Sequence, residues 1–175
     1  TIIRIEEGAF SHSALESISV PDNVTEIGKE AFLNTPSLKE VNLGNGLTTI
    51  GYEAFRDCVN LAEIKIPNSV TKIDNYAFNK CTNLSNVVLS KELVTLGKYA
   101  FEECVSLENI EIPKSLTDSQ GTLVYQSNES YYATGPFSKC SSLSKVTFEE
   151  GTQVIAPYLF ANCTGLKRIT IPETI

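Results

Sequence analysis

The 175-residue chain contains no methionine, no tryptophan and a single histidine, His12. No apolar stretch approaches the ~20 residues that a membrane-spanning helix requires. The formal net charge is -7, so the chain lacks the lysine and arginine surplus that draws proteins to nucleic acid or to an anionic membrane. These absences disfavour a nucleic acid partner and membrane insertion.

The residues of common catalytic and metal sites are also scarce. No cysteine pair has the C-x-x-C spacing of a zinc site, and one histidine cannot complete a usual ligand set. Nothing places an acid near His12, whose neighbours are Ser11 and Ser13, so a surface histidine is favoured over a catalytic triad. We therefore expect no enzyme activity, no metal and no cofactor.

Phenylalanine, in contrast, recurs in register along the whole chain. Seven of the eight phenylalanines form one column: Phe10, Phe32, Phe55, Phe78, Phe101, Phe137 and Phe160. The steps between them are 22, 23, 23, 23, 36 and 23 residues. A fixed period of this length is the signature of a solenoid.

Other columns keep step with the phenylalanines and give the unit I-G-x-x-A-F-x-x-C-x-x-L-x-x-I-x-I-P-x-x-V-T-x. The I-x-I segment alternates apolar and polar residues, which predicts a short strand with one buried face. Proline follows this strand at Pro21, Pro67, Pro113 and Pro172 and ends it. The uneven apolar steps around A-F suit a tight helical or irregular return segment.

One such unit cannot bury its apolar face alone, so the units are expected to stack around a continuous core. The fold prediction is an α/β solenoid, a right-handed superhelix with one parallel sheet of short strands and about seven coils of 23 residues. Residues 1–175 are expected to form a single domain. The chain begins at Thr1 without a signal peptide, so we expect a processed or excised piece of a longer array, with targeting signals outside it.

The motif from Ala54-Phe55-Arg56-Asp57-Cys58 to Ile66-Pro67 resembles the BspA-like, Treponema-type leucine-rich repeat. The resemblance covers nearly the whole chain. It implies a bacterial surface or secreted protein, with an adhesin that binds host or bacterial surface components as one expected role. The repeat columns are scaffold, so the resemblance transfers no binding residues.

All five cysteines stand three residues after a column phenylalanine, at Cys58, Cys81, Cys104, Cys140 and Cys163. Ser13 and Thr35 hold the same position in the first two repeats. A position that accepts serine, threonine and cysteine is expected to be small and buried. The prediction is a ladder of free thiols, although disulfides between adjacent coils remain geometrically possible.

The first candidate binding surface is formed by the residues that flank each central strand residue and point outward. Its candidates are Glu40, Asn42, Glu63, Lys65, Asn86, Val88, Asn109, Glu111, Lys145, Thr147, Arg168 and Thr170, with Ser17 and Ser19 at the start of the two columns. No large aromatic residue lies among them. An ordinary solvated sheet explains these residues equally well.

The second candidate is the insertion, placed at about 117–131, that produces the step of 36. Insertions in solenoids map to loops and are often functional. Tyr125 and Tyr131 are the candidate contacts, because tyrosine offers a large contact area and a polar tip. Tyr132 is expected to replace the core isoleucine five residues before Phe137.

Two functions stay open from the sequence. In the first, the chain is an extracellular interaction module whose partner is a protein or a surface glycan, such as a host matrix or cell-surface component. In the second, it is an intracellular or structural spacer with no ligand of its own, a role compatible with reduced thiols.

Overall fold

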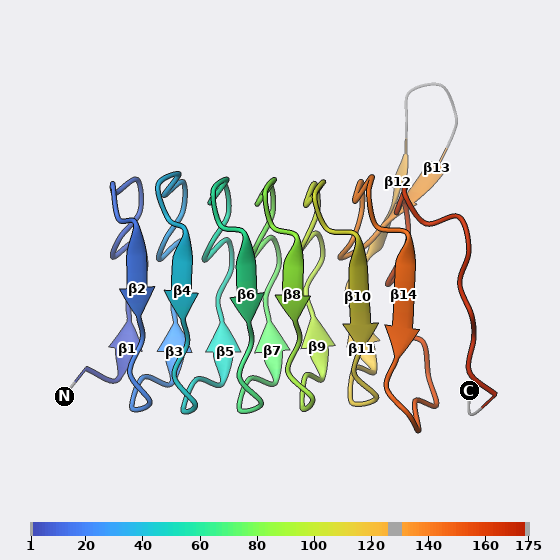
Figure 1. Ribbon diagram of the computed structural model, residues 1–175, viewed down its shortest axis with the longest axis horizontal. Coiled ribbons are helices and arrows are strands. Elements are labelled where there is room, and N and C mark those ends of the chain that lie inside the picture. Colours follow the sequence, from blue (N-terminus) through green and yellow to red (C-terminus); the bar gives the residue numbers. More distant parts are fainter. Residues whose placement is uncertain (1, 126–130, 174–175) are drawn as a thin grey trace.

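The computed structural model describes residues 2–125 and 131–173, and it shows a solenoid whose strands run along two faces (Figure 1). One face, called here the strand face, comprises β2 (Ser17–Ser19), β4 (Glu40–Asn42), β6 (Glu63–Lys65), β8 (Asn86–Val88), β10 (Asn109–Ile112) and β14 (Lys145–Phe148). The other is a six-stranded parallel sheet of β1 (Arg4–Ile5), β3 (Glu26–Ile27), β5 (Thr49–Ile50), β7 (Lys72–Ile73), β9 (Thr95–Leu96) and β11 (Asp118–Ser119). The sequence predicted only the strand face as a sheet.

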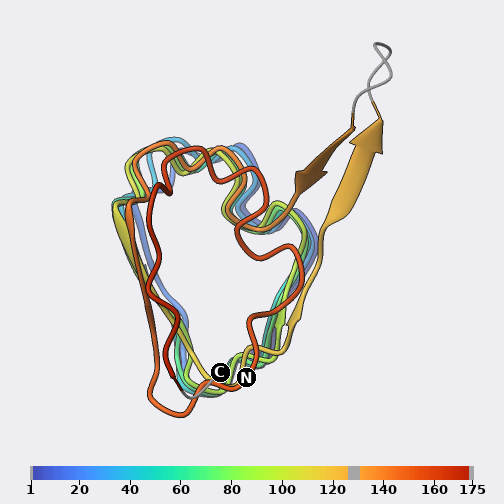
Figure 2. The same ribbon diagram turned by 90° about the vertical axis from the view of Figure 1, so that its right-hand side faces the viewer.

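Apolar residues from both faces fill the interior of the coil. Ile64 of β6 is buried while its neighbours Glu63 and Lys65 are exposed, and the other strands of this face keep the same alternation. On the opposite sheet, Ile27, Ile50 and Ile73 are fully buried and pair in register. Viewed along the axis, the coils superimpose into one outline around this core (Figure 2).

The column phenylalanines form a stacked spine inside the coil. Phe32, Phe55, Phe78, Phe101 and Phe137 are fully buried. Neighbouring ring centroids lie 4.9–5.8 Å apart along the column from Phe10 to Phe160. Phe10, at one end of the stack, is 37% exposed because no described coil covers its outer side. The predicted spine is confirmed.

The prediction of an α/β solenoid is wrong in its helical part, because the described residues form no helix. In the return segment of the second repeat, Glu30 and Asn34 adopt positive φ, and similar residues recur in later repeats. Alternate amides, such as those of Phe32 and Asn34, donate to the next coil instead of to a carbonyl four residues back. The A-F segment is therefore a ladder of turns that hydrogen-bonds along the solenoid.

The regular part of the solenoid has about five turns of about 23 residues, not the predicted seven. The repeat around Phe160 forms no strand in the described residues. Arg168, Ile169 and Thr170 were predicted to form one, but they lie exposed in irregular backbone. Ile169 is 38% exposed because no described coil packs over it.

The extra residues form a hairpin of β12 (Thr122–Tyr125) and β13 (Tyr131–Thr134), which projects from the side of the stack (Figure 2). The predicted insertion at 117–131 thus begins too early, since Asp118–Ser119 continue the six-stranded sheet. Part of that predicted range, 126–130, lies outside the described residues. Gly121 and Gly135 frame the hairpin, and a Cβ on Gly135 would meet the Tyr158 carbonyl oxygen at 1.9 Å.

The prediction that Tyr132 fills the core column is wrong. Ser119 pairs with Leu96 and occupies that position, with its hydroxyl donating to the Pro157 carbonyl. Tyr132 lies in β13 and is 38% exposed. The 36-residue step from Phe101 to Phe137 does not show whether the core position lies just before Phe137 or before the inserted residues. The sequence therefore could not distinguish Tyr132 from Ser119 at this position.

Candidate functional site

The strand face presents the outward residues that the sequence predicted. The flanking residues from Ser17 to Thr147 lie on strands of this face and are exposed, whereas Arg168 and Thr170 are exposed without belonging to a strand. They alternate with the buried central residues, as in Glu40–Val41–Asn42. The face is thus a row of polar side chains that runs across the strands.

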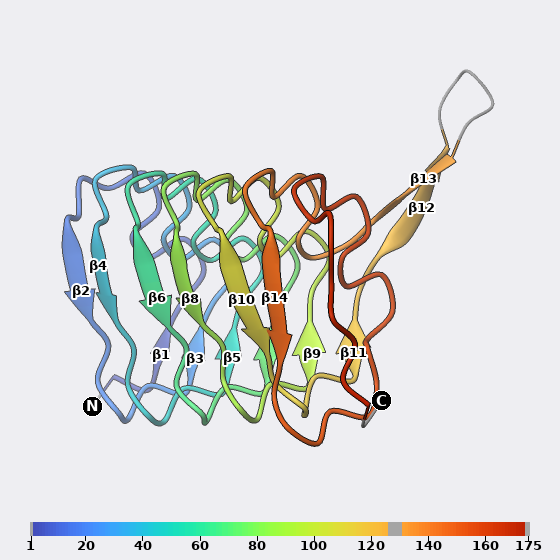
Figure 3. The same cartoon turned by 45° about the vertical axis from the view of Figure 1, so that its right-hand side comes forward.

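This face is not a continuous sheet but three hydrogen-bonded pairs of strands, β2–β4, β6–β8 and β10–β14 (Figure 3). Among the described residues no backbone ladder joins β4 to β6 or β8 to β10. The six-stranded sheet on the opposite side continues without interruption through the same coils. The strand face therefore opens at every second junction, while the other face holds the solenoid together.

Proline recurs in step with these openings. Within the third pair, the Glu149 amide donates to the Ile112 carbonyl at 2.9 Å and closes the ladder beyond the strands. Pro67 and Pro113 hold the position of Glu149 in the repeats that begin the second and third pairs. Proline has no N–H, so this bond cannot form to the preceding strand. The sequence signal for this alternation is proline at every second repeat.

A cleft lies at each opening. Cleft A, at the opening between β4 and β6, extends over β8. It has a volume of about 430 Å³ and is lined by Glu40, Val41, Asn42, Glu63, Ile64, Lys65, Asn86 and Val88. Cleft B, between β8 and β10, has a volume of about 220 Å³ and is lined by Asn86, Val87, Val88, Leu89, Lys91, Asn109, Glu111, Pro113 and Glu149. Eight of the predicted contact residues meet in these two clefts.

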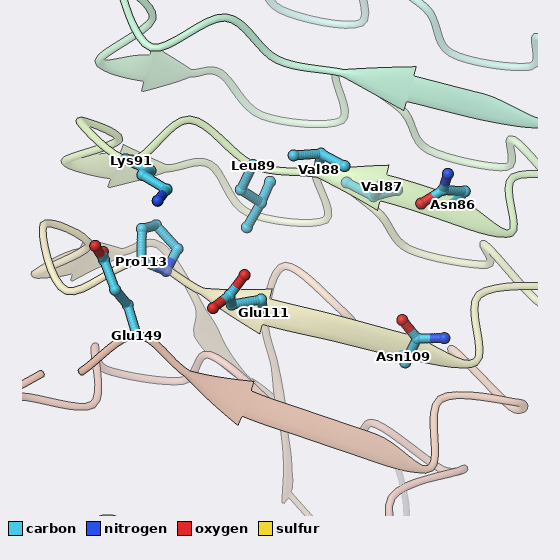
Figure 4. Close-up of a pocket in the computed structure, with 9 residues that line it drawn as sticks. All are labelled: Asn86, Val87, Val88, Leu89, Lys91, Asn109, Glu111, Pro113 and Glu149. Carbon is cyan, nitrogen blue, oxygen red and sulfur yellow. The ribbon is translucent and has the colours of Figure 1, made fainter.

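The side chains of cleft B are arranged along its length (Figure 4). Asn86 of β8 and Asn109 of β10 lie at one end, and Lys91, Pro113 and Glu149 lie at the other. The Glu149 carboxylate accepts a hydrogen bond from the Lys114 amide at 3.1 Å, which fixes its position. The cleft therefore offers carboxamide, carboxylate and ammonium groups in a short space.

Cleft C, between β14 and the last repeat, has a different charge. Its lining includes Lys145, Thr147, Arg168 and Thr170. Cleft A holds two carboxylates and one lysine, whereas cleft C holds two cations and no carboxylate. The strand face thus changes from acidic to basic along the solenoid axis.

The hairpin carries the tyrosines predicted as contacts. Tyr125 and Tyr131 pair across the two strands, with ring centroids 5.1 Å apart. Tyr125 is 57% exposed and Tyr131 is 68% exposed, and Leu123 beside them is also exposed. The two rings form an aromatic patch away from the strand face.

A ladder of tyrosines lies on the return segments and was not predicted from the sequence. Tyr52, Tyr76 and Tyr99 are half-buried, and their ring centroids lie 5.8 and 5.0 Å apart. Burial raises the pKa of Tyr52 and Tyr76, and Lys98 lies 4.7 Å from the Tyr99 ring centroid. The signal was the recurrence of tyrosine two or three residues before the column phenylalanine.

The cysteines contribute no site. All five are free, and no group of three metal-ligating side chains occurs among the described residues. The Cys58, Cys81, Cys104 and Cys140 thiols each donate to the carbonyl of the column phenylalanine one coil earlier, at 3.1–3.3 Å. Thr35 makes the equivalent bond to Phe10 at 3.1 Å. The predicted free-thiol ladder is therefore confirmed, and its hydrogen bonds explain why threonine fits the same position.

In the part of the chain that the structure describes, no helix is long and apolar enough to span a membrane. No curated protein matches the chain. The BspA type leucine-rich repeat region, in six copies, matches residues 3–131 and 130–175.

The similar solved structures include the following three. The leucine-rich repeat protein of T. pallidum is 26% identical with a TM-score of 0.74, over 94% of this chain and 72% of its own. A leucine-rich cell surface protein of Faecalibacterium prausnitzii is 26% identical with a TM-score of 0.60, over 95% of this chain and 50% of its own. The pneumococcal vaccine antigen PcpA is 26% identical with a TM-score of 0.71, over 89% of this chain and 38% of its own. With its repeat, its stacked coils and these relatives, the chain belongs to the BspA-type leucine-rich repeat family.

Proposed function

We propose that the chain is the interaction module of a cell-surface or secreted bacterial protein and binds a surface component through the strand face. The observation that carries this proposal is the row of exposed polar side chains interrupted by clefts A and B. A solvated scaffold face needs no recurrent openings, whereas ligand sites are concave and hold a few placed polar groups. Leucine-rich repeats of this family are typically non-catalytic and suggest binding.

The proposed location rests on the relatives. They include a leucine-rich cell surface protein and a pneumococcal vaccine antigen. An acidic surface with a net charge of -7 suits a soluble module that stays off anionic membranes. A ligand for this module is expected among proteins and glycans of a host matrix or a cell surface.

The test is binding of the labelled chain to arrays of matrix proteins and of surface glycans. We expect saturable binding that falls when Glu63, Asn86 and Asn109 are replaced together by alanine. A matched triple variant of Thr25, Thr48 and Thr71, which lie beside the opposite sheet, is expected to bind normally. Absence of binding to every array, with the chain folded, would support the alternative of a structural spacer.

The hairpin is a second candidate surface. Exposed tyrosines supply contact area at low entropic cost, and Tyr125 and Tyr131 form the exposed pair. If the ligand reaches the hairpin, Tyr125→Ala with Tyr131→Ala lowers affinity on the same arrays. If affinity is unchanged, binding is confined to the repeats.

A further inference from the structure

Clefts A and B lie at equivalent openings of the strand face, two coils apart. Each opens between a strand that ends one hydrogen-bonded pair and the strand that begins the next, which proline follows. The two clefts adjoin, because Asn86 and Val88 of β8 line both of them. Asn42 and Val88 are equivalent positions, as are Glu63 and Asn109, and Lys65 and Glu111. The side chains at these positions differ, but the openings themselves recur along the axis, which fits a ligand that repeats along its own length.

The polar groups of both clefts match hydroxyl groups. Carboxylates accept from hydroxyls, ammonium groups donate to them, and the carboxamides of Asn42, Asn86 and Asn109 do both. No aromatic ring or arginine lines clefts A and B, although these residues anchor most protein interfaces. Both clefts mix carboxylates with lysine, so neither presents the cationic surface that an anionic polymer would need.

Resting on the proposed function, we infer that clefts A and B are successive subsites for a neutral linear polysaccharide that lies across the strands, parallel to the solenoid axis. Each cleft receives hydroxyl groups of one segment of the polymer. Because neither cleft has a ring to stack on a sugar, a single subsite binds weakly. Affinity arises when one chain fills both clefts, since the second contact is then intramolecular.

Length is therefore the first measurement. Calorimetry measures the titration of the full chain with β-1,4-linked glucose oligosaccharides of increasing length. The monosaccharide is expected not to bind. Affinity is expected to rise at least about tenfold once the oligomer spans both clefts. A flat dependence on length overturns the proposal, and so does preference for polygalacturonate, an anionic polymer.

Two variants locate the binding. Glu111→Gln removes one of the two carboxylates of cleft B and is expected to lower affinity for the long oligomer about tenfold, the loss of one charge-assisted hydrogen bond. Its control is Glu16→Gln, which removes an equal charge outside both clefts. Pro113→Ser keeps the polar side chains of cleft B but restores an N–H toward the Leu89 carbonyl, so closure of the cleft is expected to abolish the length dependence. Pro21→Ser is its control, because no described strand precedes β2 on this face.

The outcomes separate the two proposals. If no oligosaccharide binds but a matrix protein binds and Glu111→Gln weakens that binding, the polysaccharide inference is overturned and the proposed function stands. If oligosaccharides bind equally to Glu111→Gln and wild type, the clefts are not the subsites and the inference fails. If neither class of ligand binds the folded chain, both proposals are overturned.

Discussion

The position three residues after each column phenylalanine requires a small hydrogen-bond donor. Cys58 donates to the Phe32 carbonyl, and burial raises the pKa of its thiol from 9.0 to about 12. The folded state therefore holds the proton at pH values where the unfolded chain releases it. Stability from this thiol is present below pH about 9 and is lost as the pH rises toward 12.

Cys58→Thr tests this pH dependence. Threonine keeps the donor, as Thr35 does in the preceding coil, and does not ionise. The variant is expected to lose less stability than wild type between pH 9 and 11, as measured by urea unfolding at each pH. An identical decline in both proteins would mean that the thiol does not control alkaline unfolding.

The phenylalanine spine gives a second prediction at the scale of the residue. Phe78→Ala removes a fully buried ring stacked on both sides and is expected to cost about 3–5 kcal/mol. Phe10→Ala is the control, because Phe10 is stacked on one side only and partly exposed. Urea denaturation measures both. An equal loss in the two variants would contradict the spine as the main source of core stability.

Strands were the elements best predicted from the sequence. The strand-face positions follow from alternation, since Val41 and Ile64 must turn inward where Glu40 and Glu63 are exposed. The return segments could not be predicted, because their form depends on hydrogen bonds between coils and on positive φ at residues such as Glu30 and Tyr76. The strands of the six-stranded sheet contain two residues each, too few to give a periodic signal.

The hairpin is an element that the solenoid does not need. Its side chains Leu123, Tyr125 and Tyr131 are exposed, so its removal uncovers little core. Replacing residues 123–133 by a short glycine-rich loop, which keeps the buried Thr134, is expected to lower stability by less than about 1 kcal/mol, or about 2–4 °C in thermal midpoint.

A longer deletion that also removes β11 is the comparison for this prediction. It removes Ser119, which lies in β11 and pairs with β9. The Ser119 hydroxyl also donates to the Pro157 carbonyl in the last repeat. That deletion is expected to destabilise the chain clearly more than the first, as followed by circular dichroism on heating. If the shorter deletion alone abolishes cooperative unfolding, the hairpin is structural and its proposed binding role loses its basis.

At the scale of the whole molecule, the two faces join the coils differently. Across the junction between the second and third coils, the Thr71 amide donates to the Thr48 carbonyl at 3.0 Å on one side, while β4 and β6 share no ladder on the other. The solenoid is thus continuous along one face and divided into two-coil units along the strand face. This arrangement lets the strand face open locally without breaking the stack.

Amide hydrogen exchange measures this asymmetry. The Asn86 and Lys145 amides bond to the preceding coil at 3.2 Å within their pairs, so they are expected to be protected. Glu63 and Asn109 hold the equivalent positions at the openings and are expected to exchange much faster. Thr71 is the internal control, because it crosses the same junction as Glu63 but on the continuous face. Equal protection of Asn86 and Asn109 would mean that clefts A and B close in solution, and ligand entry would then require an opening motion.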